Sequence, residues 1–152
     1  MNRYLVKVIA TGCGSGYFPV ASGTAGTIAA IPLYLILSPL SWPMYLLTVV
    51  AFSFLAVYVS QAAEVIFQEK DSSRIVIDEW AGFLWSMLLI APTTAHIIGA
   101  AVLFRIFDVL KPYPARFFQD KLPGGYGVVM DDVAAGMYAN LGMHILIRGG
   151  IF

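Results

Sequence analysis

The fold of this chain is decided by its longest uncharged stretch, which reads VIATGCGSGYFPVASGTAGTIAAIPLYLILSPLSWPMYLLTVVAFSFLAVYVSQAA (residues 8–63). Pro39 and Pro43 divide the stretch, because proline cannot continue a helix. Two further uncharged runs follow at residues 80–104 and 133–147. A buried helical core could accommodate two such segments, but hardly three. The pattern therefore predicts an all-α fold, a compact helical membrane domain.

Composition supports this class and excludes others. The 152 residues predict a single domain, 1–152, in which 59% of residues are hydrophobic and 12% are charged. Soluble domains average about 25% charged residues. The formal net charge is zero and no basic run occurs, so nucleic acid is not an expected partner. A lone cysteine, Cys13, excludes an internal disulfide.

Turn residues divide the chain into five main apolar helices and one short amphipathic helix. The Gly-rich segments 12–26 and 123–127 are predicted to be loops. The third helix is short for a full span, which needs about 20 apolar residues. The expected helices are 25–37 with Thr24 as N-cap, 44–67, 78–91, 94–111, the amphipathic 115–122, and a last one from Asp131 or Asp132 to 148.

Helices that run alternately up and down would separate the charges. The turns at 38–43 and 91–95 carry no Lys or Arg and fall on one side. The N-terminus, the loop 69–74 and the segment 105–121 fall on the other side with eight of the nine basic residues. The positive-inside rule makes that side cytoplasmic. We therefore expect a multi-pass protein whose site opens to the cytoplasm.

Two acid pairs lie beside the apolar segments on this face, Asp78-Glu79 and Asp131-Asp132. Helix capping would explain one pair, because carboxylates favour a helix N-terminus. Two pairs close together repel each other unless a cation joins them. Small residues follow each pair at helical spacing, and they would let the helices approach closely. Such stripes are also common in ordinary membrane packing, and they would allow a homodimer.

A third motif places Arg105, Asp108 and Lys111 three residues apart on one helical face. The simplest explanation is a pair of salt bridges at a helix end. The same stripe suits phosphate with a metal, in which Asp108 binds Mg²⁺ while Arg105 or Lys111 holds phosphoryl oxygens. The carboxylate-rich composition favours Mg²⁺ over metals that prefer His or Cys.

Ser22, Thr24 and Thr27 surround a predicted helix start, where hydroxyls and backbone N–H groups could bind phosphate. The segment is not a P-loop, because no Gly-Lys-Ser/Thr follows. Neither an Asp-x-Asp motif nor a cysteine-phosphatase loop occurs. Metal-assisted attack by water, with a carboxylate as general base, is the chemistry that remains.

Four blocks in order resemble the phosphatidylglycerophosphatase A family. They are GSGYFP (14–19) with GTAGTIAAIP (23–32), Asp71 with IVIDEWAG (75–82), FRxxDxxKPxP (104–114), and GGxGxxxDDxxAG (124–136). The resemblance implies a bacterial inner-membrane enzyme that removes the terminal phosphate of phosphatidylglycerophosphate, a lipid, with Mg²⁺ as cofactor. It also implies that the five matching acids, Asp78, Glu79, Asp108, Asp131 and Asp132, are catalytic.

We expect Glu79, Asp108, Asp131 and Asp132 to bind the metal. Arg105 and Lys111, with Ser22, Thr24 and Thr27, are the predicted substrate-binding residues. The sequence leaves open which acid is the base. A lipid-headgroup phosphotransferase would need a longer Asp-rich consensus. The alternative of another class, a small membrane cation channel or transporter, would place acids at mid-membrane instead of at helix ends.

Overall fold

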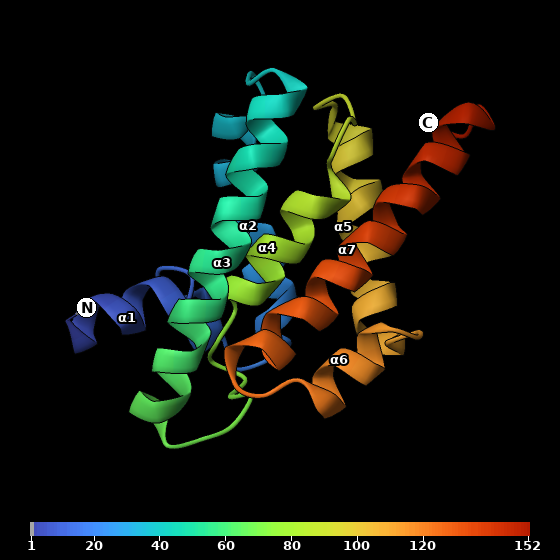
Figure 1. Cartoon of the computed structure of the whole chain (residues 1–152). Coiled ribbons are helices and arrows are strands. Elements are labelled where there is room, and N and C mark those ends of the chain that lie inside the picture. The colour runs from blue at the N-terminus through green and yellow to red at the C-terminus, as the bar shows by residue number, and fades with distance from the viewer. Residues whose placement is uncertain (1) are drawn as a thin grey trace.

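The computed structural model describes residues 2–152, and most of them are helical (Figure 1). Within this range there are seven α-helices, one short 3-10 helix and no β-strand, which confirms the all-α prediction. In chain order the elements are α1 (Arg3–Ala10), η1 (Ser15–Tyr17), α2 (Ser22–Leu37), α3 (Trp42–Phe67), α4 (Ile77–Ser86), α5 (Thr94–Leu110), α6 (Ala115–Lys121) and α7 (Gly125–Arg148).

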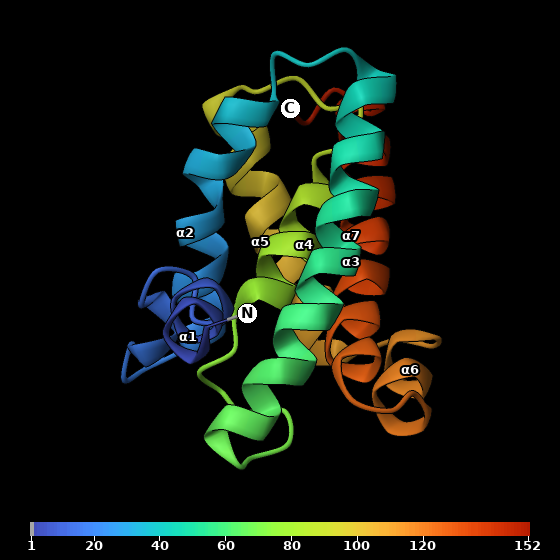
Figure 2. The ribbon, with the colours of Figure 1, turned by 60° about the vertical axis from the view of Figure 1, so that its left-hand side comes forward.

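Helix α4 is the centre of the bundle and contacts α2, α3, α5 and α7 (Figures 1 and 2). The sequence predicted a helix to residue 91, but α4 ends at Ser86. Neighbouring helices satisfy its last carbonyls: the Tyr45 hydroxyl donates to Leu84 O at 2.8 Å, and the Asn140 amide donates to Ser86 O at 3.1 Å. Because these donors come from α3 and α7, a ten-residue helix ends inside the protein without orphaned carbonyls.

Small residues bring α4 and α7 into close contact, as their spacing predicted. A Cβ atom on Gly136 would overlap the carbonyl oxygen of Gly82. A Cβ atom on Gly82 would lie 2.6 Å from the carbonyl oxygen of Asp132. The two backbones are therefore packed directly against each other. This contact places the acidic first turn of α4 beside the acidic turn of α7.

Helix α7 begins at Gly125, well before the acid pair at which its start was predicted. Gly124, with φ of 55°, leads into the helix. A Cβ atom on Gly125 would overlap the carbonyl oxygen of Val57 in α3. These glycines serve close packing instead of forming a flexible loop. Asp131 and Asp132 consequently lie in the second turn of α7, and they do not cap it.

Helix α2 also begins earlier than predicted. Its N-cap is Ala21, which has φ of 53° and no side-chain acceptor. Ser22 and Gly23 are already helical, so Thr24 lies in the first turn and does not cap the helix. The Thr27 hydroxyl donates to Gly23 O at 2.9 Å within the same helix.

The charged side chains gather toward one end of the bundle, and Arg148 is the basic residue that lies toward the other end. The turns after α2 and α4 and the C-terminus lie at the upper end in Figure 1. The helices α1 and α6 and the loop after α3 lie toward the lower end (Figures 1 and 2). The helices α2, α3, α4, α5 and α7 thus alternate in direction, although α4 covers only part of the length.

Helix α3 is the one helix in residues 2–152 that is long and apolar enough to cross a membrane. It has 26 residues, and its most apolar window has a mean hydropathy of 1.9 and is only 33% buried. Helix α2 is apolar but shorter. Large apolar side chains on the other long helices are also exposed, among them Ile36, Val102 and Ile145.

Candidate active site

A polar pocket of about 510 Å³ opens at the charged end of the bundle. Its walls are the start of α2, the loop before α4, the first turn of α4, the last turns of α5 and the first two turns of α7. Six carboxylates and two cationic side chains line it, so its charge is strongly negative when all are ionised. They are Asp71, Asp78, Glu79, Asp108, Asp131, Asp132, Arg105 and Lys111.

Three of these carboxylates form a compact cluster. Asp78, Glu79 and Asp132 each contribute one oxygen, and these oxygens lie within 4.8 Å of one another. Asp78 and Asp132 are buried, with 7% and 4% of their surfaces exposed. Asp78 Oδ1 and Glu79 Oε2 are buried and have no hydrogen-bond partner among residues 2–152. A cluster of carboxylate oxygens with buried, unpartnered members could hold a hard divalent cation, which prefers oxygen ligands.

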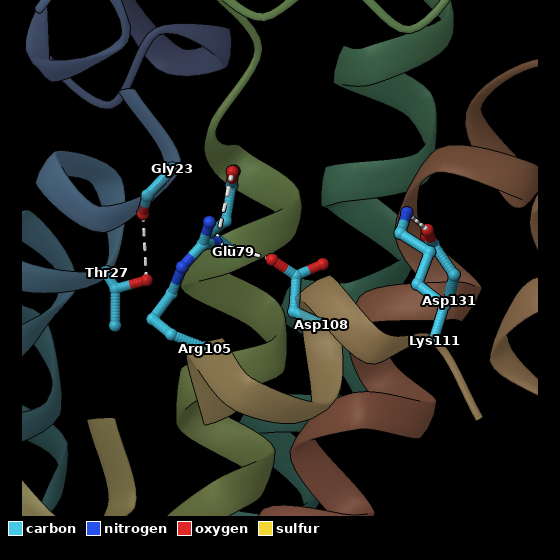
Figure 3. Close-up of polar contacts among 7 residues, drawn as sticks. All are labelled: Gly23, Thr27, Glu79, Arg105, Asp108, Lys111 and Asp131. Carbon is cyan, nitrogen blue, oxygen red and sulfur yellow. Dashed lines mark hydrogen bonds and ion pairs between the residues drawn. The ribbon is translucent and has the colours of Figure 1, made fainter. Parts of the chain in front are cut away.

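Arg105 lies between two acids on the neighbouring side of the pocket (Figure 3). Its Nη1 is 2.6 Å from Asp108 Oδ2 and 3.8 Å from Glu79 Oε1. The pair with Asp108 confirms the predicted i,i+3 salt bridge. A Cβ atom on Gly23 would contact Glu79 Oε1 and lie 2.7 and 2.8 Å from the two terminal guanidinium nitrogens. Only a glycine leaves room there for the guanidinium group beside α2.

Lys111 forms a second ion pair, but with a different partner from the one its spacing indicated. Its Nζ donates to Asp131 Oδ2 at 2.5 Å, and no ion pair with Asp108 is found in the described residues (Figure 3). Lys111 is the C-cap of α5 and has φ of 44°. Pro112 follows, and a residue before proline is disfavoured in the helical conformation. The side chain therefore leaves the α5 stripe and reaches α7.

Burial dominates the electrostatics of the acids. Burial and the neighbouring carboxylates raise the pKa of Asp78 and of Asp132 above the ordinary value, and burial raises the pKa of Glu79. Burial also raises the pKa of Asp131 to about 6, against the opposing attraction of Lys111. Burial lowers the pKa of Lys111, but Asp131 and its acidic neighbours outweigh this effect and raise it. A cation in the cluster would restore the ionised carboxylates.

The sequence profile described as Phosphatidylglycerophosphatase A matches residues 8–147. The chain belongs to this family. It is 36% identical over 132 residues to "Phosphatidylglycerophosphatase A" of Escherichia coli (strain K12), covering 86% of this chain and 76% of that protein. It is 36% identical over 137 residues to the Haemophilus influenzae protein of the same name, covering 88% and 83%.

A third relative carries a different name. The chain is 41% identical over 146 residues to a Bacteroides thetaiotaomicron protein called "Putative phosphatidylinositol-3-phosphatase", covering 90% of this chain and 89% of that protein. No solved structure gives a significant match. The names of all three relatives describe phosphatases of phosphorylated lipids.

In this member of the phosphatidylglycerophosphatase A family, the predicted hydroxyl residues separate. Ser22 lines the acidic pocket, whereas Thr24 and Thr27 line an apolar groove next to it. The Thr27 hydroxyl is already engaged by the Gly23 carbonyl. The structure thus brings all five predicted acids, Arg105, Lys111 and Ser22 to one pocket, and it places Thr24 and Thr27 outside it.

Several pocket residues were missing from the predicted site, and Gly23 and Asp71 are the two that contact its charged side chains or add a carboxylate. Gly23 was read only as part of a Gly-rich turn, and its role depends on contacts with α4 and α5 that spacing does not reveal. Asp71 lines the pocket, and Asp71 Oδ2 accepts a hydrogen bond from the Gln119 amide at 3.0 Å. Its presence in the same motif block as Asp78 was the signal that could have identified it.

Proposed function

We propose that this protein hydrolyses the terminal phosphate of phosphatidylglycerophosphate to give phosphatidylglycerol and inorganic phosphate. Membership of the phosphatidylglycerophosphatase A family makes it a phosphoric monoester hydrolase. The observation that carries the proposal is the buried cluster of Asp78, Glu79 and Asp132, with two cationic side chains in the same pocket. Such a pocket offers a place for a divalent cation and separate donors for phosphoryl oxygens.

We propose Mg²⁺ as the cation, held by the three clustered carboxylates. The fit rests on their converging oxygens and on the unpartnered Asp78 Oδ1 and Glu79 Oε2. Magnesium prefers oxygen ligands and tolerates few protein carboxylates, because it retains several waters. We also propose Asp108 and Asp131 as metal ligands. Their ion pairs indicate that they first hold Arg105 and Lys111 in position.

The pocket's own residues supply binding and orientation. Bound Mg²⁺ would neutralise the phosphoryl group and activate water for attack. Arg105 and Lys111 would hold phosphoryl oxygens. Asp108 keeps the Arg105 side chain in place, and Asp131 keeps the Lys111 side chain in place. A carboxylate with an unpartnered oxygen, Asp78, Glu79 or Asp131, would accept the proton of the attacking water. The bond between phosphorus and the ester oxygen breaks, and that oxygen takes up a proton and leaves as the hydroxyl of phosphatidylglycerol.

We further propose that the protein is an integral, multi-pass protein of the bacterial inner membrane with its acidic pocket at the cytoplasmic face. Helix α3 is long enough to cross, and exposed apolar side chains on α2, α5 and α7 suit lipid contact. The charged end carries the basic residues that favour the cytoplasm. In this position the acyl chains stay in the bilayer while the phosphate reaches the pocket.

The test is phosphate release from phosphatidylglycerophosphate in detergent micelles, with Mg²⁺ or with EDTA. We expect release with Mg²⁺, loss with EDTA, and loss in Asp132→Asn with the fold retained. Phosphatidylinositol 3-phosphate belongs in the same assay, because the Bacteroides relative is named for that substrate. Faster release from the inositol lipid would move the assignment to that headgroup. No release from either lipid would refute the proposal and make cation flux in liposomes the next measurement.

A further inference from the structure

An apolar groove of about 680 Å³ runs between α2 and α5 and leads away from the acidic pocket. Six side chains define this α2–α5 groove here: Thr27, Ile28 and Ile31 from α2, and Ile98, Val102 and Ile106 from α5. Ile28, Ile98 and Val102 are each more than half exposed. The Thr27 hydroxyl is turned to its own backbone, so the wall of the groove is almost entirely hydrocarbon.

The α2–α5 groove adjoins the acidic pocket. Arg105 and Val109 line both. The Arg105 guanidinium lies beside Glu79 and Asp108 in the pocket, and the same residue also lines the groove. A ligand with its phosphate at Arg105 would therefore have its hydrocarbon tail next to this groove.

A second apolar groove provides the comparison. The α3–α7 groove, of about 590 Å³, is lined by residues that include Phe54, Trp85, Met137 and Leu141. Among residues 2–152 it shares no lining residue with the acidic pocket. Bulk lipid would occupy any exposed apolar groove, so exposure does not distinguish the two. Adjacency to the site distinguishes them, because only the α2–α5 groove of these two shares lining residues with the acidic pocket.

The dimensions also agree with one layer of a bilayer. From Ile98 to Val109, helix α5 rises about 16 Å. That is roughly half of a hydrocarbon core about 30 Å thick. A lipid with its phosphate in the acidic pocket would lay an acyl chain along this length, toward the middle of the membrane.

We propose that the α2–α5 groove binds an acyl chain of the lipid phosphate monoester during hydrolysis. The proposal rests on the function proposed above. It adds that the lipid reaches the acidic pocket from the bilayer between α2 and α5, and not from the α3–α7 face. The groove then makes the enzyme select phosphate monoesters that carry long chains over the same headgroup without them.

The first experiment compares kcat/KM for phosphatidylglycerophosphate with long chains and for its deacylated headgroup, in Mg²⁺ and detergent. Ile28→Trp and Val102→Trp place a large side chain in the groove. The ratio of kcat/KM for the long-chain lipid to kcat/KM for the deacylated headgroup should then fall about tenfold. That is the loss expected when the acyl chain gives up contacts worth about two buried methylene groups. Leu141→Trp is the matched control, since Leu141 is 58% exposed in the α3–α7 groove, and its ratio should not change. A fall in Leu141→Trp equal to that in the groove variants would overturn the proposal.

The second experiment does not depend on turnover. Phosphatidic acid with a photoreactive group in its acyl chain is crosslinked to the wild-type protein, beside phosphatidylcholine with the same group. The proposal expects the phosphate monoester to label α2 and α5 more strongly than phosphatidylcholine does. Equal labelling by both lipids, or enrichment on α3 and α7, would refute it. If wild type hydrolyses no lipid, the proposed function fails, and this labelling still decides where a lipid phosphate binds.

Discussion

Gly23→Ala should damage the site while leaving the fold intact. The added Cβ atom would lie 2.7 and 2.8 Å from the terminal nitrogens of Arg105 and would also contact Glu79 Oε1. Both obstacles are ends of flexible side chains, so the helix itself need not move. The guanidinium must move instead, and its 2.6 Å contact with Asp108 would be lost.

The size of the effect follows from the hydrogen bond proposed between Arg105 and a phosphoryl oxygen. A hydrogen bond to a charged group contributes about 1.5–3 kcal/mol. Each ~1.4 kcal/mol is a factor of ten in rate. If Arg105 holds a phosphoryl oxygen in the transition state, kcat/KM for phosphatidylglycerophosphate should fall roughly 10- to 100-fold. The assay is phosphate release with saturating Mg²⁺, together with a melting curve to check the fold.

Gly142→Ala is the matched control, because it makes the same helical substitution far from the pocket. Its Cβ atom would meet only the flexible end of Leu103, at 3.2 Å, and Phe107 at 4.0 Å. Alanine is also the better helix former. We expect wild-type activity and unchanged or slightly higher stability. Wild-type kcat/KM in Gly23→Ala, with its fold retained, would refute the role given to Arg105.

Three further predictions concern packing and charge. Gly136→Ala should lower the unfolding free energy by about 1–3 kcal/mol, measured by thermal denaturation in detergent, because the added methyl overlaps the Gly82 carbonyl; a melting temperature like that of Gly142→Ala would contradict the close α4–α7 contact. Lys111→Met should lower the unfolding free energy by about 3–5 kcal/mol, since it leaves buried Asp131 unpaired. Adding Asp131→Asn should restore much of the lost unfolding free energy. No restoration in this double variant would argue against the ion pair. Mg²⁺ should raise the melting temperature more at pH 7.5 than at pH 5, because the raised pKa values of the acids keep them protonated at low pH; an equal increase at both pH values would place the metal elsewhere.

The parts of the fold that could be predicted are those governed by local rules. Prolines and uncharged runs located the long helices, and helical spacing predicted both the Arg105–Asp108 pair and the close contact through Gly82 and Gly136. Each of these depends on residues within a few positions of one another or on a repeated small-residue stripe.

The parts that were missed depend on distant neighbours. The early end of α4 requires donors from Tyr45 and Asn140, which lie on other helices. Lys111 leaves its stripe because Pro112 changes the backbone, and its partner on α7 is fixed only by tertiary packing. Glycines near Gly125 were interpreted as flexible, whereas contact with α3 is the reason that no side chain is tolerated there.

Asp78, Glu79 and Asp132 are the proposed ligands of a divalent cation in the acidic pocket. The most direct measurement is the anomalous scattering of Mn²⁺, used in place of Mg²⁺, in crystals of the wild-type protein. We expect a manganese peak within coordination distance of all three carboxylates, and its loss in Asp132→Asn. A peak that avoids this cluster, or full activity in EDTA with no peak, would show that these three carboxylates do not hold a catalytic metal.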